Sequence, residues 1–156
     1  MSWAVLAVVL LSQLTGKVVA VADGDTLTVR TSNQTVKVRM IHIDAPESRQ
    51  AFGTRAKQNL SDLVFGKDVE LIGREKDRYG RLLALVKVDG KEVNLEQVKA
   101  GYGWAFLEYK PPAEYIEAER QARVRKSGLW VDPNPIPPWE FRRQVRAKSK
   151  KAAKAK

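Results

Sequence analysis

Apolar and polar residues alternate over short stretches in the first half of the chain, as in β-strands with one buried face. Over Thr26–Thr31, Leu27 and Val29 alternate with threonines and an arginine. Asp23-Gly24-Asp25 separates this stretch from the β-branched run Leu14–Ala22 and gives a strong turn signal between two strands. Further strands are predicted at Thr35–Ile43, Val69–Ile72 and Leu82–Val88, and Asp89-Gly90 forms a tight hairpin from the last of them to Glu92-Val93.

Elsewhere the apolar residues recur at helical spacing. Gly66 follows the first such segment where a helix C-cap belongs. Asn94 and Gln97 resemble a capping box, and Pro111-Pro112 can open a final helix. The predicted helices span Ala51–Phe65, the residues from Asn94 to near Gly101, and Ala113–Lys126.

Five short strands with an inserted helix favour a small, partly open β-barrel over a parallel sheet. The length of 156 residues is about that of one domain. After Trp130 the chain becomes proline-rich and then basic, which we interpret as an extended strap rather than a second domain. We therefore divide the chain into an apolar N-terminal segment (1–13), a β-rich domain (14–130) and a proline-rich strap with a basic tail (131–156).

The composition excludes several kinds of chemistry. There is no cysteine, so disulfides, thiolate metal sites and cysteine catalysis are ruled out. The single histidine, His42, lies in an apolar stretch and is more typical of a structural residue than of a ligand. A multi-histidine zinc site within one chain is also excluded. Acid–base or metal chemistry would have to be carried by carboxylates, arginines and tyrosines.

The net charge of +10 is concentrated at the C-terminus. Residues 141–156 hold eight basic side chains and no acidic one, so residues 1–140 carry only +2. Such a tail favours polyanions such as nucleic acid without selecting a sequence. It is equally compatible with a solvated end that aids solubility.

The N-terminal segment is unusual because Trp3–Leu11 is uninterrupted apolar sequence. It is too short to cross a bilayer, for which about 20 residues are needed. It has the length of a signal-peptide core but lacks the basic start and the cleavage site. A shortened signal, an uncleaved anchor, and a strand or helix packed on the core all stay open, and we expect export to the cell envelope or beyond.

Three polar clusters interrupt the apolar pattern: Asp23-Gly24-Asp25-Thr26, Arg39 with Ile43–Glu47, and Asp77–Arg81. Each alone has an ordinary explanation, as a hairpin turn, a loop-capping carboxylate or a solvated arginine. Together they supply hard oxygen ligands for Ca²⁺ or Mg²⁺ and planar donors for phosphate. Such a set could cleave phosphodiesters without histidine. Arg39 and Asp44 would point to opposite faces of a straight strand, so the strand must bend or bulge between them.

These motifs resemble the staphylococcal (micrococcal) nuclease family of thermonuclease-like domains. The resemblance covers roughly Leu14 to Trp130, and three separated motifs in order are far more specific than any one. The matching stretches are VVAVADGDTLTV, VRMIHIDAPE, DRYGRLLALVKVDGKEVN and GWAFLEYKPP.

The resemblance implies an OB-fold, a five-stranded barrel with about three helices, and Ca²⁺-dependent cleavage of DNA and RNA. It implies that Asp25 and Asp44 are Ca²⁺ ligands, together with the backbone carbonyl of Ala45. The family pattern has threonine at that position, but a carbonyl ligand tolerates alanine. Asp23 would be a further carboxylate beside the metal.

The resemblance also implies the catalytic roles. Glu47 would act as general base or orient the attacking water, and Arg39 and Arg81 would neutralise charge on the phosphoryl oxygens. Arg81 would also lie near the leaving 5′-oxygen, and the products would carry 3′-phosphates and 5′-hydroxyls. The residues expected to contact nucleotides are Arg78, Tyr79 and Tyr109.

The chain departs from the family pattern in two places. The stretch after Glu47 is shorter, and the strap and basic tail lie outside the resemblance. We expect a monomer with DNA and RNA as partners, no obligate protein partner, and membrane contact only through Trp3–Leu11. The alternatives are an OB-fold module that binds nucleic acid or protein without cutting, and a membrane-anchored envelope protein with an incidental nuclease fold.

Overall fold

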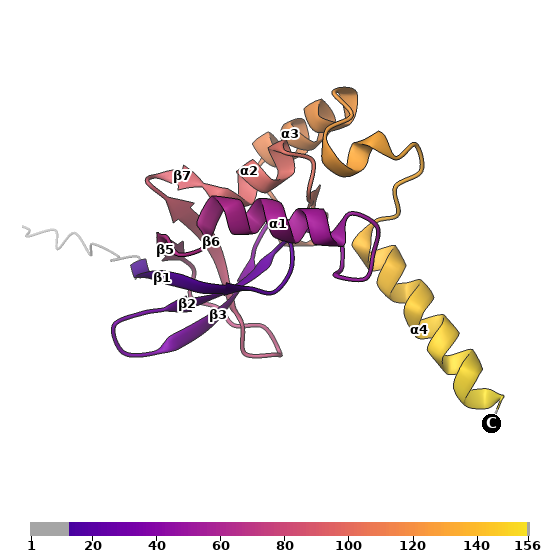
Figure 1. The fold of residues 1–156 in the computed structure, drawn as a ribbon, viewed down its shortest axis with the longest axis horizontal. Coiled ribbons are helices and arrows are strands. Elements are labelled where there is room, and N and C mark those ends of the chain that lie inside the picture. The colour runs from indigo at the N-terminus through magenta and orange to yellow at the C-terminus, as the bar shows by residue number, and fades with distance from the viewer. Residues whose placement is uncertain (1–12, 156) are drawn as a thin grey trace, which may run out of the picture.

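The computed structural model describes residues 13–155. Five β-strands form a barrel, and along most of them buried side chains alternate with more exposed ones (Figure 1). The strands are ordered β3-β2-β1-β5-β6, and β3 also pairs in parallel with β6, which closes the barrel. The predicted five-stranded, OB-type α+β fold is confirmed, with the barrel closed rather than partly open. The strands are β1 (Gln13–Val21), β2 (Thr26–Arg30), β3 (Thr35–Met40), β5 (Asp68–Ile72) and β6 (Leu82–Val88).

The strand predicted over Thr35–Ile43 is interrupted. β3 ends at Met40, and His42 adopts a left-handed backbone conformation (φ 69°) that redirects the chain. A short strand β4 (Ile43–Asp44) then pairs with β8 (Trp104–Ala105). This is the bend that Arg39 and Asp44 require to reach one site. A further short strand, β7 (Lys91–Glu92), extends β6 as a hairpin.

Within residues 13–155 there are four α-helices: α1 lies across the barrel, α2 and α3 lie side by side, and α4 extends away from the barrel (Figure 1). No helix within residues 13–155 is long and apolar enough to cross a membrane. The segment Trp3–Leu11 lies outside the described residues. The helices are α1 (Gly53–Val64), α2 (Val93–Lys99), α3 (Ala113–Val124) and α4 (Pro138–Lys154), with 3₁₀ turns η1 (Leu107–Tyr109) and η2 (Gly128–Val131).

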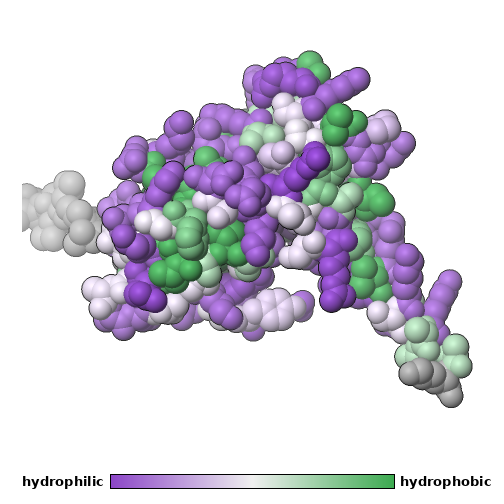
Figure 2. Space-filling view, viewed as in Figure 1, coloured by the Kyte–Doolittle hydropathy of each residue, from purple (hydrophilic) through white to green (hydrophobic). Residues whose placement is uncertain are grey.

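The helix α4 contradicts our expectation that the chain is extended after Trp130 and that the helix after Pro111-Pro112 is the last. It starts from Pro137 as N-cap, with Pro138 in its first turn. Glu140 in the first turn and lysines in the last turn complement the helix dipole. Its far end projects from the body of the molecule (Figure 1), and hydrophobic residues lie at the surface of its first half (Figure 2).

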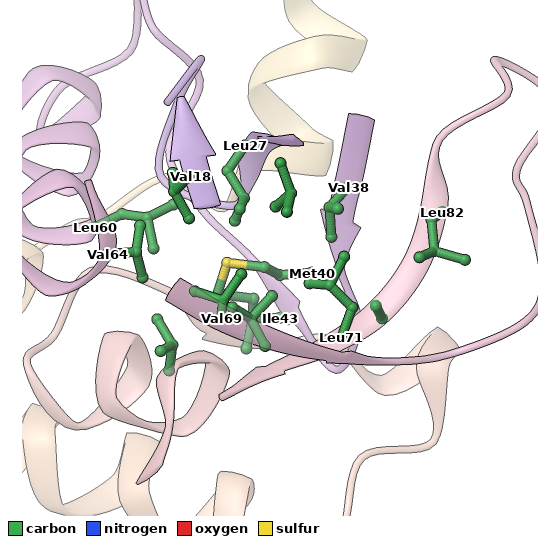
Figure 3. Packing of buried hydrophobic residues seen from close by; sticks show 14 of the residues in the cluster. Val18, Leu27, Val38, Met40, Ile43, Leu60, Val64, Val69, Leu71 and Leu82 are labelled. Atoms are coloured by element: carbon green, nitrogen blue, oxygen red, sulfur yellow. The ribbon is translucent and has the colours of Figure 1, made fainter. Parts of the chain in front are cut away.

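The barrel interior is filled by aliphatic side chains. Leu27 and Val29 are fully buried, as the alternation in their strand predicts. Leu60 and Val64 of α1 point toward Val18 and cover one end of the barrel (Figure 3). This core fixes the strand ends from which the candidate site is built.

The predicted capping box is wrong, because α2 begins at Val93 and neither Asn94 nor Gln97 caps it. Both side chains are fully buried and bind backbone groups of other elements. Asn94 accepts from the amide of Val86 at 2.9 Å. Gln97 donates to the carbonyl oxygens of Gly24 (2.9 Å) and Ala56 (2.8 Å). Gln97 therefore ties the turn between β1 and β2 to α1.

Candidate active site

The turn between β1 and β2 carries the first two candidate carboxylates. Asp23 Oδ1 accepts the backbone N–H of Asp25 at 3.0 Å, which folds the turn on itself. Gly24 packs so closely against the side chains of Ala45 and Ala56 that there is no space for a Cβ atom. Burial, reinforced by the Asp25 carboxylate, raises the pKa of Asp23 to about 7.

Arg39, at the end of β3, joins the two buried carboxylates. Its guanidinium donates to the carbonyl oxygens of Met40 (2.6 Å) and Ile43 (3.0 Å). It also pairs with Asp44 Oδ1 at 3.2 Å and Asp25 Oδ2 at 3.3 Å. Burial opposes its charge, but these two carboxylates more than offset that and raise the pKa of Arg39. The bend at His42 makes this arrangement possible, because it brings Ile43 and Asp44 back toward Arg39.

Asp44 and the loop after it form the floor of the site. Asp44 is 1% exposed, and burial raises its pKa. The backbone N–H of Ala45 donates to Asp25 Oδ2 at 2.7 Å, so the loop is tied to the β1–β2 turn. The backbone N–H of Glu47 donates to the Gln50 side chain at 3.1 Å, and the Glu47 side chain is 35% exposed.

The opposite side is formed by the loop between β5 and β6. Asp77 Oδ1 accepts the backbone N–H groups of Tyr79 (2.9 Å) and Arg81 (3.0 Å). Its other oxygen pairs with the guanidinium of Arg81 at 2.7 Å. Arg78 lies over the ring of Tyr79, 4.8 Å from its centroid. This loop presents two arginines and a tyrosine that is 67% exposed.

Tyr109 lies near Arg39, with the guanidinium carbon 5.8 Å from the ring centroid. Its backbone oxygen lies 3.1 Å from Nδ1 of His42. The imidazole also packs edge-on against Tyr115. His42 therefore has a structural position, as the sequence analysis favoured.

All ten residues singled out from the sequence line one cleft of about 280 Å³. They come from the β1–β2 turn, β3, β4 and the loop after it, the β5–β6 loop and η1, so the fold brings together residues that are far apart in the sequence. The residues are Asp23, Asp25, Arg39, Asp44, Ala45, Glu47, Arg78, Tyr79, Arg81 and Tyr109.

Three further residues of the cleft were missed by the sequence analysis: Phe106, Arg142 and Arg146. Arg142 donates to Asp44 Oδ2 at 2.8 Å and to Glu47 Oε1 at 2.6 Å. The prolines before α4 and the spacing of Phe141 and Val145 are signals for a helix, but we interpreted this segment as a strap. Nothing local in the sequence indicates a contact between residues 98 positions apart.

The oxygen atoms of the cleft suit a hard cation. Asp25 and Asp44 approach each other closely enough to share one guanidinium, and Arg142 already places positive charge between Asp44 and Glu47. Within residues 13–155, no three His, Asp or Glu side chains are grouped as metal ligands. The carboxylates of Asp25 and Asp44 and the carbonyl of Ala45 would be hard oxygen donors, of the kind that Ca²⁺ and Mg²⁺ take together with water.

Several known proteins are similar in sequence to this chain over most of its length. A family model described as staphylococcal nuclease homologue matches residues 37–132. The chain is 48% identical over 131 residues to an uncharacterized endonuclease of Haemophilus influenzae, covering 83% of this chain and 74% of that protein. It is 43% identical over 139 residues to a micrococcal nuclease of Shigella flexneri (82% and 80% covered). It is 40% identical over 144 residues to Protein ParB of Escherichia coli (85% and 81% covered).

Proposed function

Because this chain belongs to the staphylococcal nuclease family and is a nuclease, we propose that it cleaves both DNA and RNA with Ca²⁺. The products proposed are 3′-phosphates and 5′-hydroxyls. The observation that carries the proposal is the single cleft in which Asp25, Arg39, Asp44 and Glu47 lie together with Arg81. A module that only binds nucleic acid has no need for this combination of buried carboxylates and arginines.

Asp25, Asp44 and the carbonyl of Ala45 would hold the Ca²⁺ ion. When bound, Ca²⁺ would act as a Lewis acid that polarises the scissile phosphate. The two carboxylates are preorganised for this role, because both residues are almost fully buried (Asp25 4% and Asp44 1% exposed). Arg39 and the Ala45 amide hold their positions in advance.

Glu47 would take a proton from the attacking water or orient it toward phosphorus, as its partial exposure at the cleft allows. The water oxygen forms the new P–O bond, and the bond from phosphorus to the 5′-oxygen breaks. The leaving 5′-oxygen takes a proton from solvent water and becomes the hydroxyl product, and Glu47 would return its proton to solvent. Arg39 and Arg81 would stabilise the added negative charge, because guanidinium groups match phosphoryl oxygens in pairs.

Binding of either nucleic acid would depend on features that DNA and RNA share. Tyr79 and Tyr109 offer rings on which bases of any sequence can stack. Arg78 lies beside Tyr79 and would contact phosphate. None of these groups selects for a 2′-hydroxyl, which supports a nuclease without sugar preference.

The direct test is digestion of one labelled DNA and one labelled RNA of the same sequence, with Ca²⁺ and with EGTA. A Glu47→Gln variant keeps the size of the side chain and the backbone hydrogen bond to Gln50. We expect both substrates to be cut only with Ca²⁺, and the variant to lose about 10²-fold or more in kcat. End-group analysis should find 3′-phosphates.

A Glu75→Gln variant is the matched control, because Glu75 is a carboxylate outside the cleft and its backbone oxygen accepts from Leu83. It should cut like the unchanged protein. Binding without cutting under Ca²⁺ and other divalent ions would contradict the proposed reaction. Equal cutting in EGTA would contradict the role of the metal.

For location, we propose export to the cell envelope or beyond, on the apolar stretch Trp3–Leu11 alone. Fractionating cells and sequencing the N-terminus of the mature protein tests this. Recovery of the intact chain from the cytoplasm would contradict it.

A further inference from the structure

Arg142 of α4 binds the same carboxylates that the proposed reaction needs. Its two terminal nitrogens donate to both oxygens of Asp44, at 3.2 and 2.8 Å, in a forked arrangement. The first nitrogen also donates to Glu47 at 2.6 Å. The guanidinium therefore bridges a candidate metal ligand and the candidate base, and it reaches an Asp44 side chain that is only 1% exposed.

The start of α4 is fixed to the body of the protein, which holds Arg142 over the cleft. The ring of Trp139 lies 5.7 Å from that of Phe106 and 6.2 Å from that of Trp104. The Gln50 side chain donates to the carbonyl of Ile136 at 2.5 Å, just before the helix. Arg142 follows Trp139 by about one turn, so the anchored end delivers its guanidinium to the site at a high effective concentration.

We propose that Arg142 acts as a built-in cation that competes with the divalent metal ion for Asp44 and Glu47, and so keeps the active site closed until the metal binds. This inference rests on the proposed function, because it takes Asp44 as a metal ligand. A guanidinium and a metal ion cannot use the same carboxylate lone pairs, and both are drawn by the same negative charge.

The charges around Arg142 make it displaceable. Arg39 also pairs with Asp44 and with Asp25, so Asp44 would still have a cationic partner when Arg142 leaves. Arg142 is itself 34% exposed and can turn to solvent or to a substrate phosphate. Arg142 lies outside residues 37–132, the part of the chain that the family model matches.

The test is a calorimetric titration of the full-length protein with CaCl₂ at pH 7.5, without nucleic acid. Arg142→Ala should bind Ca²⁺ at least about tenfold more tightly than the unchanged protein, because no charge-assisted hydrogen bonds have to be broken first. Arg142→Lys, which keeps the charge but cannot form the fork, should fall between the two.

Arg146→Ala is the matched control, because Arg146 lines the same cleft and pairs with no carboxylate within the described residues. It removes the same charge and should change Ca²⁺ affinity by no more than about threefold. A second control, Arg143→Ala, removes a charge whose ion pair within residues 13–155 is with Glu140 on the same helix. Circular dichroism should show that all variants keep the fold.

The outcomes separate this inference from the proposed function. Equal Ca²⁺ affinity in the unchanged protein and Arg142→Ala, or an equal gain in Arg146→Ala, would overturn the competition and leave the Ca²⁺ site intact. Weaker binding in Arg142→Ala would also overturn it. If no variant binds Ca²⁺, both the competition and the proposed Ca²⁺ site fail.

Discussion

The two sides of the cleft hold their charged groups differently. On the barrel side, Arg39 is 7% exposed, and its four oxygen partners include two backbone carbonyls. On the rim, the side chains of Arg81 and Arg142 are 27% and 34% exposed and form their ion pairs with carboxylates. The fold therefore holds the barrel side (Asp25, Arg39 and Asp44) in place. The arginines of the rim (Arg81 and Arg142) can exchange their carboxylate partners for a phosphate, and the carboxylates can exchange them for a cation. A preorganised barrel side and an adaptable rim suit an enzyme that cuts many sequences.

The largest expected effect comes from breaking the barrel side with Arg39→Ala. Two buried carboxylates would then face each other without a shared cation. We expect the free energy of unfolding to fall by about 3 kcal/mol, because breaking a buried charge network leaves uncompensated charge. Cleavage should fall by about 10³-fold. Urea denaturation and kcat/KM on labelled DNA measure the two effects.

Arg81→Ala on the rim is the counterpart of this variant. Cleavage should fall by about 10²-fold, because a phosphate donor is lost. The free energy of unfolding should change by less than about 1 kcal/mol, because the pair with Asp77 is partly exposed. Equal losses of stability in Arg39→Ala and Arg81→Ala would contradict the contrast between the barrel side and the rim.

A smaller effect should come from Gln97→Ala, because Gln97 holds the β1–β2 turn in place but does not line the cleft. Its amide donates to the carbonyls of Gly24 and Ala56 and accepts from the side chain of Asn59, and all three bonds would be lost from the interior. We expect a loss of about 2 kcal/mol in unfolding free energy and about tenfold in kcat, as the Asp23–Asp25 turn loosens. Gln58→Ala, which removes an exposed pair with Asp62, is the control and should change neither quantity measurably.

The smallest effect on turnover should come from ending the chain after Arg146, which removes five lysines of the tail but keeps Arg142. The slope of log K against log[salt] for DNA binding should become shallower by about 1 to 3 units, because fewer counterions are released. Turnover on short oligonucleotides should stay within about twofold. An unchanged salt slope would show that the lysines do not contact nucleic acid.

The barrel could be predicted because its signals are local, and the residues of the cleft because the motifs that contain them resemble those of the nuclease family. The alternation around Leu27 and Val29 indicates a half-buried strand, and the motifs containing Asp25, Asp44 and Arg81 keep their order along the chain. Even the bend after Arg39 could be anticipated, since a straight strand could not bring it and Asp44 to one site. That all ten residues line one cleft still had to come from the fold.

The errors arose where a local pattern has more than one tertiary use. Asn94 and Gln97 have capping-box spacing, but burial makes them partners for backbone groups of other elements. The prolines before Trp139 suggested a strap, although proline also starts helices. The contact of Arg142 with Asp44 depends on how α4 is anchored, and no sequence pattern encodes that.

A crystal structure of the full-length protein grown with CaCl₂ would test the contrast between the two sides of the cleft most directly. We expect Ca²⁺ at Asp25, Asp44 and the Ala45 carbonyl, with Arg39 keeping its bonds to Met40 and Ile43 and with Arg142 withdrawn from Asp44. The contrast between a fixed barrel side and an exchangeable rim would be contradicted if Ca²⁺ bound elsewhere. It would also be contradicted if Arg39 were displaced while Arg142 kept its place.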